Sequence, residues 1–345
     1  MYYAGIDAHL KSSTIYVMDE KGQKVKSTTV ATSREGLRAA LGVLARRRLL
    51  AAVESSGIAL WVVGMLKELG AKVVVVNPNR VRLIAESRKK TDRVDARLLA
   101  ELLRLGAAPE VHVPSEEARR KRTQLSVRRQ LVRQRTALVN QARGLLRGWG
   151  VSLEARGLGT LEGWKRALRR KEVPLYVKEL LAVLGGVFEQ LSEALEGMKV
   201  RLNHEAEQDE RVERLQTIPG VGRVSALTLV AAVDQVERFQ NAKQMTGYFG
   251  IVPTVRASGE REEQGRITRQ GRSEVRAVWI QAAHALARCR QPAAQPLQRW
   301  FHRVAYRRGL RTALVALARR MLSLAFYLLR DGTSYEPRRL RWAAA

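Results

Sequence analysis

The first 76 residues alternate between strand and helix patterns, and this alternation restricts the folds that the chain can adopt. Residues 2–31 are rich in β-branched and aromatic side chains and carry a turn signal at 20–22, which predicts an opening β-hairpin of two strands. Helical patterns over 34–48 and 59–70 flank the short apolar strand LLAAVES, and the run AKVVVVNP predicts a strand buried on both faces. Strands and helices in this order predict an α/β layer in which helices cover a sheet.

Four carboxylates stand at the ends of these elements. Asp7 lies near the end of the first strand, and Glu54 ends the strand LLAAVE. Asp92 and Asp95 share one face at the start of the helical segment DRVDARLLAELL, behind Thr91 as its N-cap. Taken singly, a lone Asp commonly caps a turn, and first-turn aspartates favour the helix dipole. Together the four supply hard oxygen ligands on rigid elements, and they predict a site for two Mg²⁺ ions that supports phosphodiester cleavage or transfer.

The charge of the chain indicates a polyanionic partner. Its 345 residues include 62 Lys and Arg against 33 Asp and Glu, a formal net charge of +29. Nucleic acid is the expected partner of a field of that size, and a merely basic surface is the alternative.

Cysteine and histidine usage restricts the metal chemistry. The single cysteine excludes an intramolecular disulfide and a zinc site built from cysteines. The five histidines show no ligand spacing, so we expect oxygen atoms to hold any metal. The N-terminus lacks a signal-peptide pattern and no stretch approaches about 20 apolar residues, so we expect a cytoplasmic protein with no membrane partner.

Basic residues concentrate in a connection over 78–90 and in a helical pattern over 116–147, which carries ten Lys and Arg against two Glu. Both stretches are expected to face phosphates. The side chains expected there are Arg88, Lys89, Lys90, Arg128 and Arg129. Helical periodicity resumes over 173–216, and two long helices suit an antiparallel coiled-coil arm, a dimerisation spacer or a plain helical bundle.

The C-terminal part contains a glycine-rich turn and a serine-bearing loop. The sequence PGVG at 219–222 lies between two apolar-periodic segments, as in helix-hairpin-helix modules, where Gly220 and Gly222 would offer backbone N–H groups to a phosphate. A generic connection between helices is the alternative. Ser258 lies among arginines before Gly259, and it is either a nucleophile or an ordinary loop serine. The arginines expected at phosphates are Arg266, Arg269 and Arg272.

The order of these motifs resembles a known family. The segments GIDAH, AAVES, VVVVNP and KKTDRVDARLLAELL are followed by IPGVGRVSALTL, YFGIVP and ASGEREEQGRITRQGR. This order is similar to that of the DEDD transposases of a large bacterial and archaeal insertion-sequence family, which are understood as recombinases guided by a structured bridge RNA. The resemblance extends from about residue 2 to about residue 330.

The resemblance implies a fold and a set of site residues. It implies a RuvC-like N-terminal domain of the ribonuclease H fold, with the four acidic residues of the family at Asp7, Glu54, Asp92 and Asp95. It also implies that Ser258 attacks DNA and forms a covalent 5′-phosphoserine, with the metal site of a partner subunit completing the active site. Ser273 is the second candidate for this role. The residues from 148 to 171 match nothing in the family that we can name.

The same resemblance implies the organisation and the partners of the chain. We expect a nuclease domain over 1–112, a helical coiled-coil arm over 113–214 that mediates dimer or tetramer contacts, and a mainly helical transposase domain over 215–345. Donor and target DNA, a guide RNA encoded outside the protein and other copies of the chain are the expected partners.

Three other functions remain open from the residues alone. A Holliday-junction resolvase uses the same fold and four carboxylates without a serine nucleophile, but it is usually a compact single domain. A sugar-kinase or actin-like ATPase needs a glycine directly after the first aspartate, and Ala8 follows Asp7 here. A non-catalytic nucleic-acid-binding protein would use only the arm and the glycine-rich turn.

Overall fold

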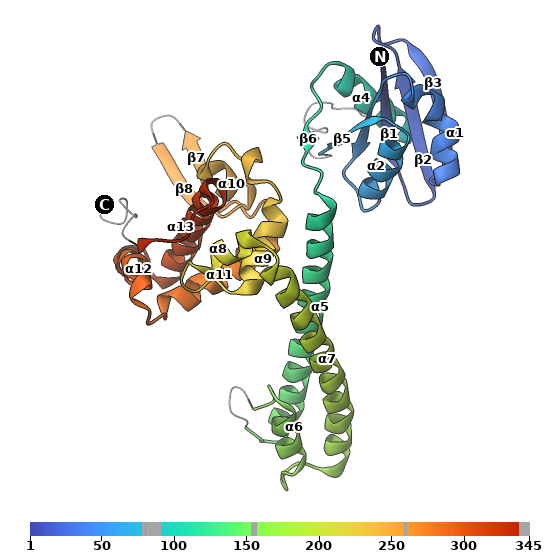
Figure 1. Cartoon of the computed structure of the whole chain (residues 1–345). Helices are drawn as coiled ribbons and strands as arrows, with labels where there is room; N and C mark the ends of the chain where they lie inside the picture. Colours follow the sequence, from blue (N-terminus) through green and yellow to red (C-terminus); the bar gives the residue numbers. More distant parts are fainter. Residues whose placement is uncertain (78–79, 81–90, 153–156, 259–260, 338–345) are drawn as a thin grey trace. The chain divides into compact units, whose positions relative to one another are not determined.

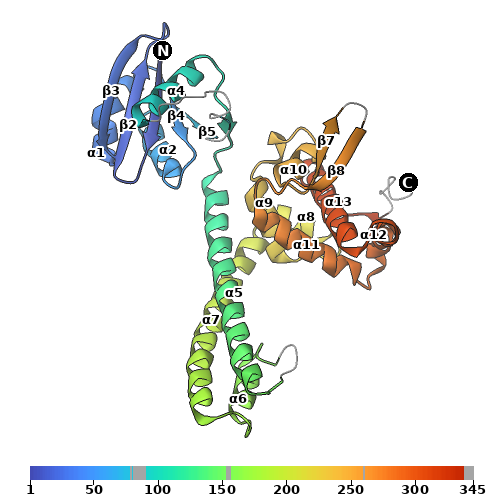
Figure 2. The same ribbon diagram turned by 180° about the vertical axis from the view of Figure 1, so that it is seen from behind.

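The computed structural model describes residues 1–345 except 78–79, 81–90, 153–156, 259–260 and 338–345 (Figures 1 and 2). For residues 255–258 and 261–264 it describes the backbone alone. The chain divides into two compact units, Met1–Pro114 and Ser115–Ala345. Among the predicted nucleic-acid contacts, Arg88, Lys89 and Lys90 lie outside the described residues.

A six-stranded mixed sheet forms the N-terminal unit, with the order β3-β2-β1-β4-β5-β6. Strands β4 and β5 run parallel to β1, whereas the pairs β1–β2, β2–β3 and β5–β6 are antiparallel. The bounds are β1 Tyr2–Ala8, β2 Ser12–Met18, β3 Lys24–Ala31, β4 Leu49–Glu54, β5 Lys72–Val76 and β6 Glu110–Val111. This arrangement confirms the predicted α/β layer.

The opening segment contains three strands, so the prediction of a two-stranded hairpin is wrong. The turn signal at 20–22 joins β2 to β3, and an earlier connection between His9 and Ser12 joins β1 to β2. Asp19 closes the second turn, because its side chain accepts hydrogen bonds from the backbone N–H groups of Lys21 (3.0 Å) and Gln23 (2.8 Å). The predicted turn at 20–22 is present, and the chain on each side of it forms a separate strand.

Helices cover both faces of this sheet (Figure 1). On one face, Ala4 and Ile6 of β1 share an apolar core with helices α1 (Arg34–Ala45) and α2 (Ala59–Glu68). On the other face, helix α4 (Asp92–Arg104) packs its leucines over Ala52 of β4 and Val76 of β5. Because side chains alternate along a strand, Gly5 and Asp7 of β1 lie on the α4 face.

Helix α4 reaches the backbone of β1 at Gly5. A Cβ atom at this position would lie 1.9 Å from the carbonyl oxygen of Ala96 and 2.6 Å from the backbone nitrogen of Ala100. Only glycine therefore allows the helix to lie this close to the strand.

The second unit begins with a long antiparallel helix pair, α5 (Glu116–Gly148) and α7 (Leu175–Glu207), with the short helix α6 (Leu161–Leu168) near its end (Figure 2). The helix predicted over 116–147 has nearly these bounds. The second periodic segment, predicted over 173–216, is interrupted at Gln208 and continues as α8 (Glu210–Gln216). Trp164 and Phe188 lie in the apolar core that α5, α6 and α7 share.

The remaining elements form a mainly helical core with one hairpin. Their bounds are α9 Arg223–Val233, η1 Val236–Arg238, α10 Ala242–Tyr248, β7 Pro253–Ser258, β8 Arg261–Ile267, α11 Ser273–Ala287, η2 Pro292–Ala294, α12 Gln295–Arg308 and α13 Leu310–Asp331. By length and composition alone, helix α13 is long and apolar enough to cross a membrane. This corrects the expectation that no stretch of the sequence approaches the apolar length of a membrane-spanning helix. It packs against α10, α11 and α12, and 61% of its most apolar window is buried.

A buried ion cluster links the start of α5 to the residues that follow α7. The Lys121 ammonium of α5 lies 2.5 Å from Asp209 and 2.5 Å from Glu117, and Arg211 also binds Asp209. Lys121 and Asp209 are 3% and 8% exposed, respectively. Burial by itself would raise the pKa of Asp209, but the hydrogen bonds and charges of Arg211 and Lys121 outweigh it and lower the pKa to about 2.

We expect Gly5→Ala to destabilise the N-terminal unit by about 3 kcal/mol or more, at the upper end of overpacking costs, because backbone atoms of α4 must move. Gly64→Ala is the matched control. Nothing lies within 4 Å of a Cβ at Gly64 inside α2, so this change should stabilise by up to about 1 kcal/mol. Denaturant unfolding measures both, and equal stability of the two variants would contradict the close contact.

We expect Asp209→Asn to destabilise the second unit by about 3–5 kcal/mol, because it leaves the Lys121 charge buried without its carboxylate. Glu210→Gln, which breaks the exposed pair with Arg214, should cost at most about 1 kcal/mol. Because the folded pKa of Asp209 is depressed, its contribution is present above the ordinary value of 3.8 and is lost as the pH falls toward about 2. A wild-type protein whose stability between these pH values equals that of Asp209→Asn at every point would contradict the assignment.

Candidate active site

Strand register places two of the predicted carboxylates side by side. In the parallel pair β1–β4, Ile6 is in register with Val53. One position further along, Asp7 therefore lies beside Glu54, and both side chains point to the face that α4 covers. Asp7 is 13% exposed, and Glu54 is half-buried.

Helix α4 brings the other two carboxylates to the same face. Thr91 caps the helix, because its side chain accepts a hydrogen bond from the backbone N–H of Val94 at 3.3 Å. Asp92 and Asp95 lie in the first turn, where the positive end of the helix dipole favours negative charge. The Asp92 side chain is 61% exposed, whereas Asp95 is half-buried.

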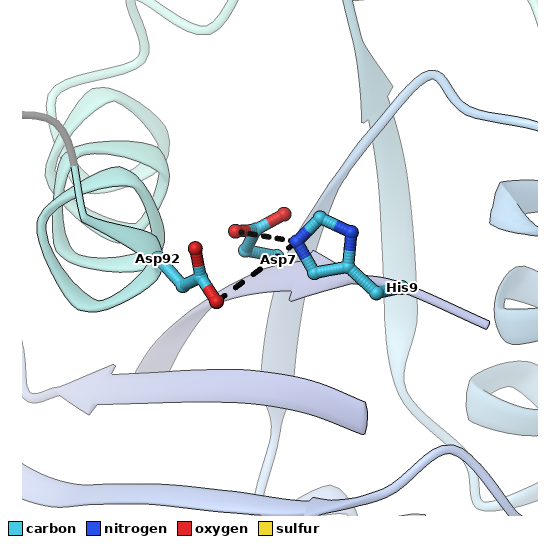
Figure 3. A group of neighbouring side chains, drawn as sticks. All are labelled: Asp7, His9 and Asp92. Atoms are coloured by element: carbon cyan, nitrogen blue, oxygen red, sulfur yellow. Dashed lines mark ion pairs between the residues drawn. The ribbon is translucent and has the colours of Figure 1, made fainter. Parts of the chain in front are cut away.

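His9 completes a group of three with Asp7 and Asp92 (Figure 3). Its Nε2 atom lies 3.4 Å from Oδ2 of Asp7 and 4.0 Å from Oδ2 of Asp92. One ligand atom from each of the three residues lies within 4.8 Å of the other two. Asp95 and Glu54 border this group from α4 and β4 and are not part of it.

The electrostatics of Asp7 show that the carboxylates interact. Burial raises the pKa of Asp7, the neighbouring His9 ring opposes this rise, and the negative charges of Asp92 and Asp95 add to it. The site thus concentrates negative charge that a cation would relieve.

His9 was not predicted as a site residue, because the five histidines of the sequence lack the spacing of a zinc site. A usable signal was present, since His9 follows Asp7 by two residues and side chains two apart on an extended chain point the same way.

The predicted serine lies in the second unit. Ser258 is the last residue of β7 and pairs with Arg261 of β8 across the hairpin. Its side chain lies outside the described atoms, as does the following Gly259. Ser273, the second candidate, is the exposed first residue of α11.

The predicted basic contacts lie in different surroundings. Arg266 and Arg269 are exposed on and after β8, and Arg269 has a left-handed backbone with φ of 56°. Arg272 and Arg129 share one carboxylate, that of Glu274, at 2.9 and 3.7 Å. Part of the predicted positive charge is therefore neutralised within the protein.

Three further predicted contacts have structural roles or are partly buried. Burial and the charge of Arg135 lower the pKa of Arg128. Gly220 has a φ of 84°, and a Cβ there would lie 2.6 Å from backbone atoms of Ala282 and Leu286, so this glycine allows the turn to touch α11. Gly222 is the exposed N-cap of α9, with nothing within 4 Å of a Cβ.

Comparison with known proteins identifies the family. A model of IS110-type DEDD proteins, described as "Transposase", matches residues 4–150, which include all four carboxylates. A second model, "Transposase IS116/IS110/IS902 family", matches residues 212–298, which include the glycine-rich turn and the serine hairpin. The chain belongs to the IS110 family of DNA transposases.

Relatives of this transposase match most of its length. A "Probable family 20 transposase" of Pseudomonas aeruginosa is 28% identical over 291 residues, which are 84% of this chain and 86% of the relative. The "Transposase for insertion sequence element IS1111A" of Coxiella burnetii is 29% identical over 77% of this chain and 74% of its own length. A "Pilin gene-inverting protein" of Moraxella bovis is 25% identical over 77% of this chain and 75% of its own length.

The acidic residues of the transposase fit a hard divalent cation. Asp7 interacts electrostatically with Asp92 and Asp95, and the strand register places Glu54 beside Asp7, which gives an oxygen-rich donor set on two strands and one helix. Oxygen ligands of this kind suit Mg²⁺ and related ions. The raised pKa of Asp7 is a second sign of fit, because a bound cation would offset the repulsion that causes part of it.

Proposed function

We propose that this transposase cuts and rejoins DNA strands at a divalent-metal site built from Asp7, Glu54, Asp92 and Asp95, with Ser258 as the nucleophile. The observation that carries the proposal is the convergence of the four carboxylates on one face of the sheet. Mg²⁺ bound there would act as a Lewis acid that stabilises charge on the phosphate oxygens. The strand order and the position of the helix are those expected of a RuvC-like ribonuclease H fold.

The carboxylates have distinct tasks in this proposal. Asp7 and Glu54 are held by adjacent strands, so their positions are fixed by backbone hydrogen bonds. The Asp92 side chain is exposed, whereas those of the other three carboxylates are partly buried. Asp92 is therefore the side chain that meets the DNA. Asp95 lies deeper on the same helix face, where it adds to the negative potential at Asp7.

The serine step conserves the energy of the phosphodiester bond. The Oγ atom of Ser258 attacks the phosphorus, its proton passes to solvent or a nearby base, and the bond from phosphorus to the 3′ oxygen breaks. The released 3′ oxygen takes up a proton, and the 5′ phosphate stays on the serine. A 3′ hydroxyl from another strand then attacks this phosphoserine and releases Ser258, so no net hydrolysis occurs.

Nucleic acids and further copies of the chain are the proposed partners. The net charge of +29 and the exposed Arg266 and Arg269 support DNA and a guide RNA as ligands. A homo-oligomer is supported by exposed apolar residues on α7 at coiled-coil spacing. These residues are Tyr176, Leu180, Val183 and Val187, which are 41–67% exposed. The relative named as a pilin gene-inverting protein supports DNA recombination as the reaction, which would take place in the cytoplasm.

We expect Asp92→Asn and Ser258→Ala each to lower recombination between a donor and a target plasmid by about a thousandfold or more, because each removes a group that acts on the transferred phosphate. Ser258→Ala removes the attacking oxygen and should leave no covalent protein–DNA adduct on denaturing gels, whereas Asp92→Asn keeps this oxygen and should still form the adduct, at its reduced rate. Glu101→Gln, at the other end of α4, and Ser273→Ala are the controls and should recombine at close to the wild-type rate.

The outcomes separate the alternatives. Normal recombination by Ser258→Ala would reject the serine role and favour a resolvase-type hydrolysis. Loss of the adduct in Ser273→Ala in place of Ser258→Ala would move the nucleophile to α11. Normal activity of Asp92→Asn would reject the metal site.

RNA guidance predicts that one defined RNA co-purifies with the full chain. Sequencing of the bound RNA measures this directly. A heterogeneous mixture in proportion to cellular abundance would instead indicate charge-driven binding alone.

A further inference from the structure

We propose that His9 supplies a nitrogen ligand to the divalent cation of the acidic site and shifts the preference of that site from Mg²⁺ toward Mn²⁺. This inference rests on the proposed metal site and adds a residue outside the four carboxylates. Figure 3 shows the imidazole ring pointing between Asp7 and Asp92, which come from different elements.

The distances suit one shared ion. For metal–ligand bonds of about 2.1 Å in an octahedral site, neighbouring ligand atoms lie about 3.0 Å apart and opposite ones about 4.2 Å apart. The Nε2 atom of His9 lies 3.4 Å from Asp7 and 4.0 Å from Asp92, within that interval. The three atoms can therefore surround one cation with little movement.

The same distances fall within the range of an ion pair but are longer than a direct charge-assisted hydrogen bond. Charge-assisted hydrogen bonds between nitrogen and a carboxylate are about 2.7–2.9 Å long. Within the described part of the chain, the ring has no hydrogen-bond or ion-pair partner other than these two carboxylates. His9 thus lies where it would bind the same metal ion as Asp7 and Asp92.

The backbone of His9 is held in place although its side chain is 59% exposed. Its N–H donates to the carbonyl oxygen of Ser12 at 3.0 Å, and its own carbonyl accepts from the Thr32 hydroxyl at 2.8 Å. Thr32 is in turn bound to the buried Ser13 at 2.7 Å. Only the side-chain torsions of His9 remain free, so binding a metal ion would cost little conformational entropy.

A nitrogen ligand has a definite effect on metal choice. Carboxylates alone suit Mg²⁺, Ca²⁺ and Mn²⁺, whereas an imidazole favours transition metals over Mg²⁺. Mn²⁺ accepts both donor types, so relative to Mg²⁺ it gains from the His9 nitrogen while keeping the carboxylate ligands.

Mn²⁺ bound to the full-length chain tests the inference by pulsed electron paramagnetic resonance. We expect the wild-type spectrum to contain electron spin-echo modulation from a directly coordinated ¹⁴N, which changes to the ¹⁵N pattern when histidine is labelled. His9→Ala should lose the modulation and bind Mn²⁺ roughly tenfold more weakly, with a smaller change for Mg²⁺. His112→Gln, in the same unit, is the matched control and should keep the modulation.

A second variant guards against misfolding of the first. His9→Asp replaces the nitrogen by an oxygen ligand, so it should bind both ions without ¹⁴N modulation and lower the ratio of Mn²⁺ to Mg²⁺ affinity by about tenfold. Binding that gives no ¹⁴N modulation in the wild type, or modulation that persists in His9→Asp, would overturn the role of His9 and leave the carboxylate site intact. Absence of Mn²⁺ binding, or binding that Asp92→Asn leaves unchanged, would overturn the metal site together with it.

Discussion

The contact of helix α4 with strand β1 at Gly5 determines where the acidic residues lie. Only the absence of a Cβ lets the two backbones come this close. Asp7 follows Gly5 by two residues on the same face of the strand, and Asp92 precedes Ala96 by one helical turn. The short distance between the two carboxylates is therefore a consequence of the packing of the two backbones. His9 extends the same strand direction by two more residues.

The site concentrates negative charge in a chain that is otherwise strongly positive. Burial and neighbouring carboxylates raise the pKa of Asp7, so the folded site bears an electrostatic cost in the absence of a cation. Elsewhere the chain pairs some of its positive charge internally, as Glu274 does with Arg129 and Arg272, and as Asp209 does with Lys121. What remains exposed, including Arg266 and Arg269, is available to a polyanion. Our proposal thus assigns the attraction of DNA and the binding of a cation to different residues.

Much of the fold could be predicted from the periodicity of apolar residues. The α/β order, the helix over 116–148 and the position of the four carboxylates at element ends all follow from local patterns. The strand count failed in the opening segment, because the turn that Asp19 closes separates two strands, β2 and β3, in addition to β1. Helix α13 exceeded the expected apolar length, because a core helix buried on most sides needs little polar surface.

The site itself was predictable in part. The carboxylates were found because hard cations require them, and the family resemblance connected them. His9 was missed because the histidines lack the spacing of a zinc site, and its two-residue spacing from Asp7 was not considered. Gly220 carried a functional expectation from its motif, yet its packing on α11 gives it a structural reason to be glycine. Local sequence cannot separate these two reasons, since both need the same residue.

Ser115, the N-cap of α5, is held by hydrogen bonds to residues of the second unit. The Ser115 backbone N–H and hydroxyl both donate to the Asp234 carboxylate, at 2.8 and 2.6 Å, and Arg211 donates to the Asp234 carbonyl oxygen at 3.2 Å. The same Ser115 oxygen caps the helix by accepting from Ala118 at 3.1 Å. The start of α5 is therefore capped by bonds within the second unit. A different N-terminal domain joined at Pro114 would leave each of these capping bonds in place, so the start of the helix pair does not depend on which domain precedes it.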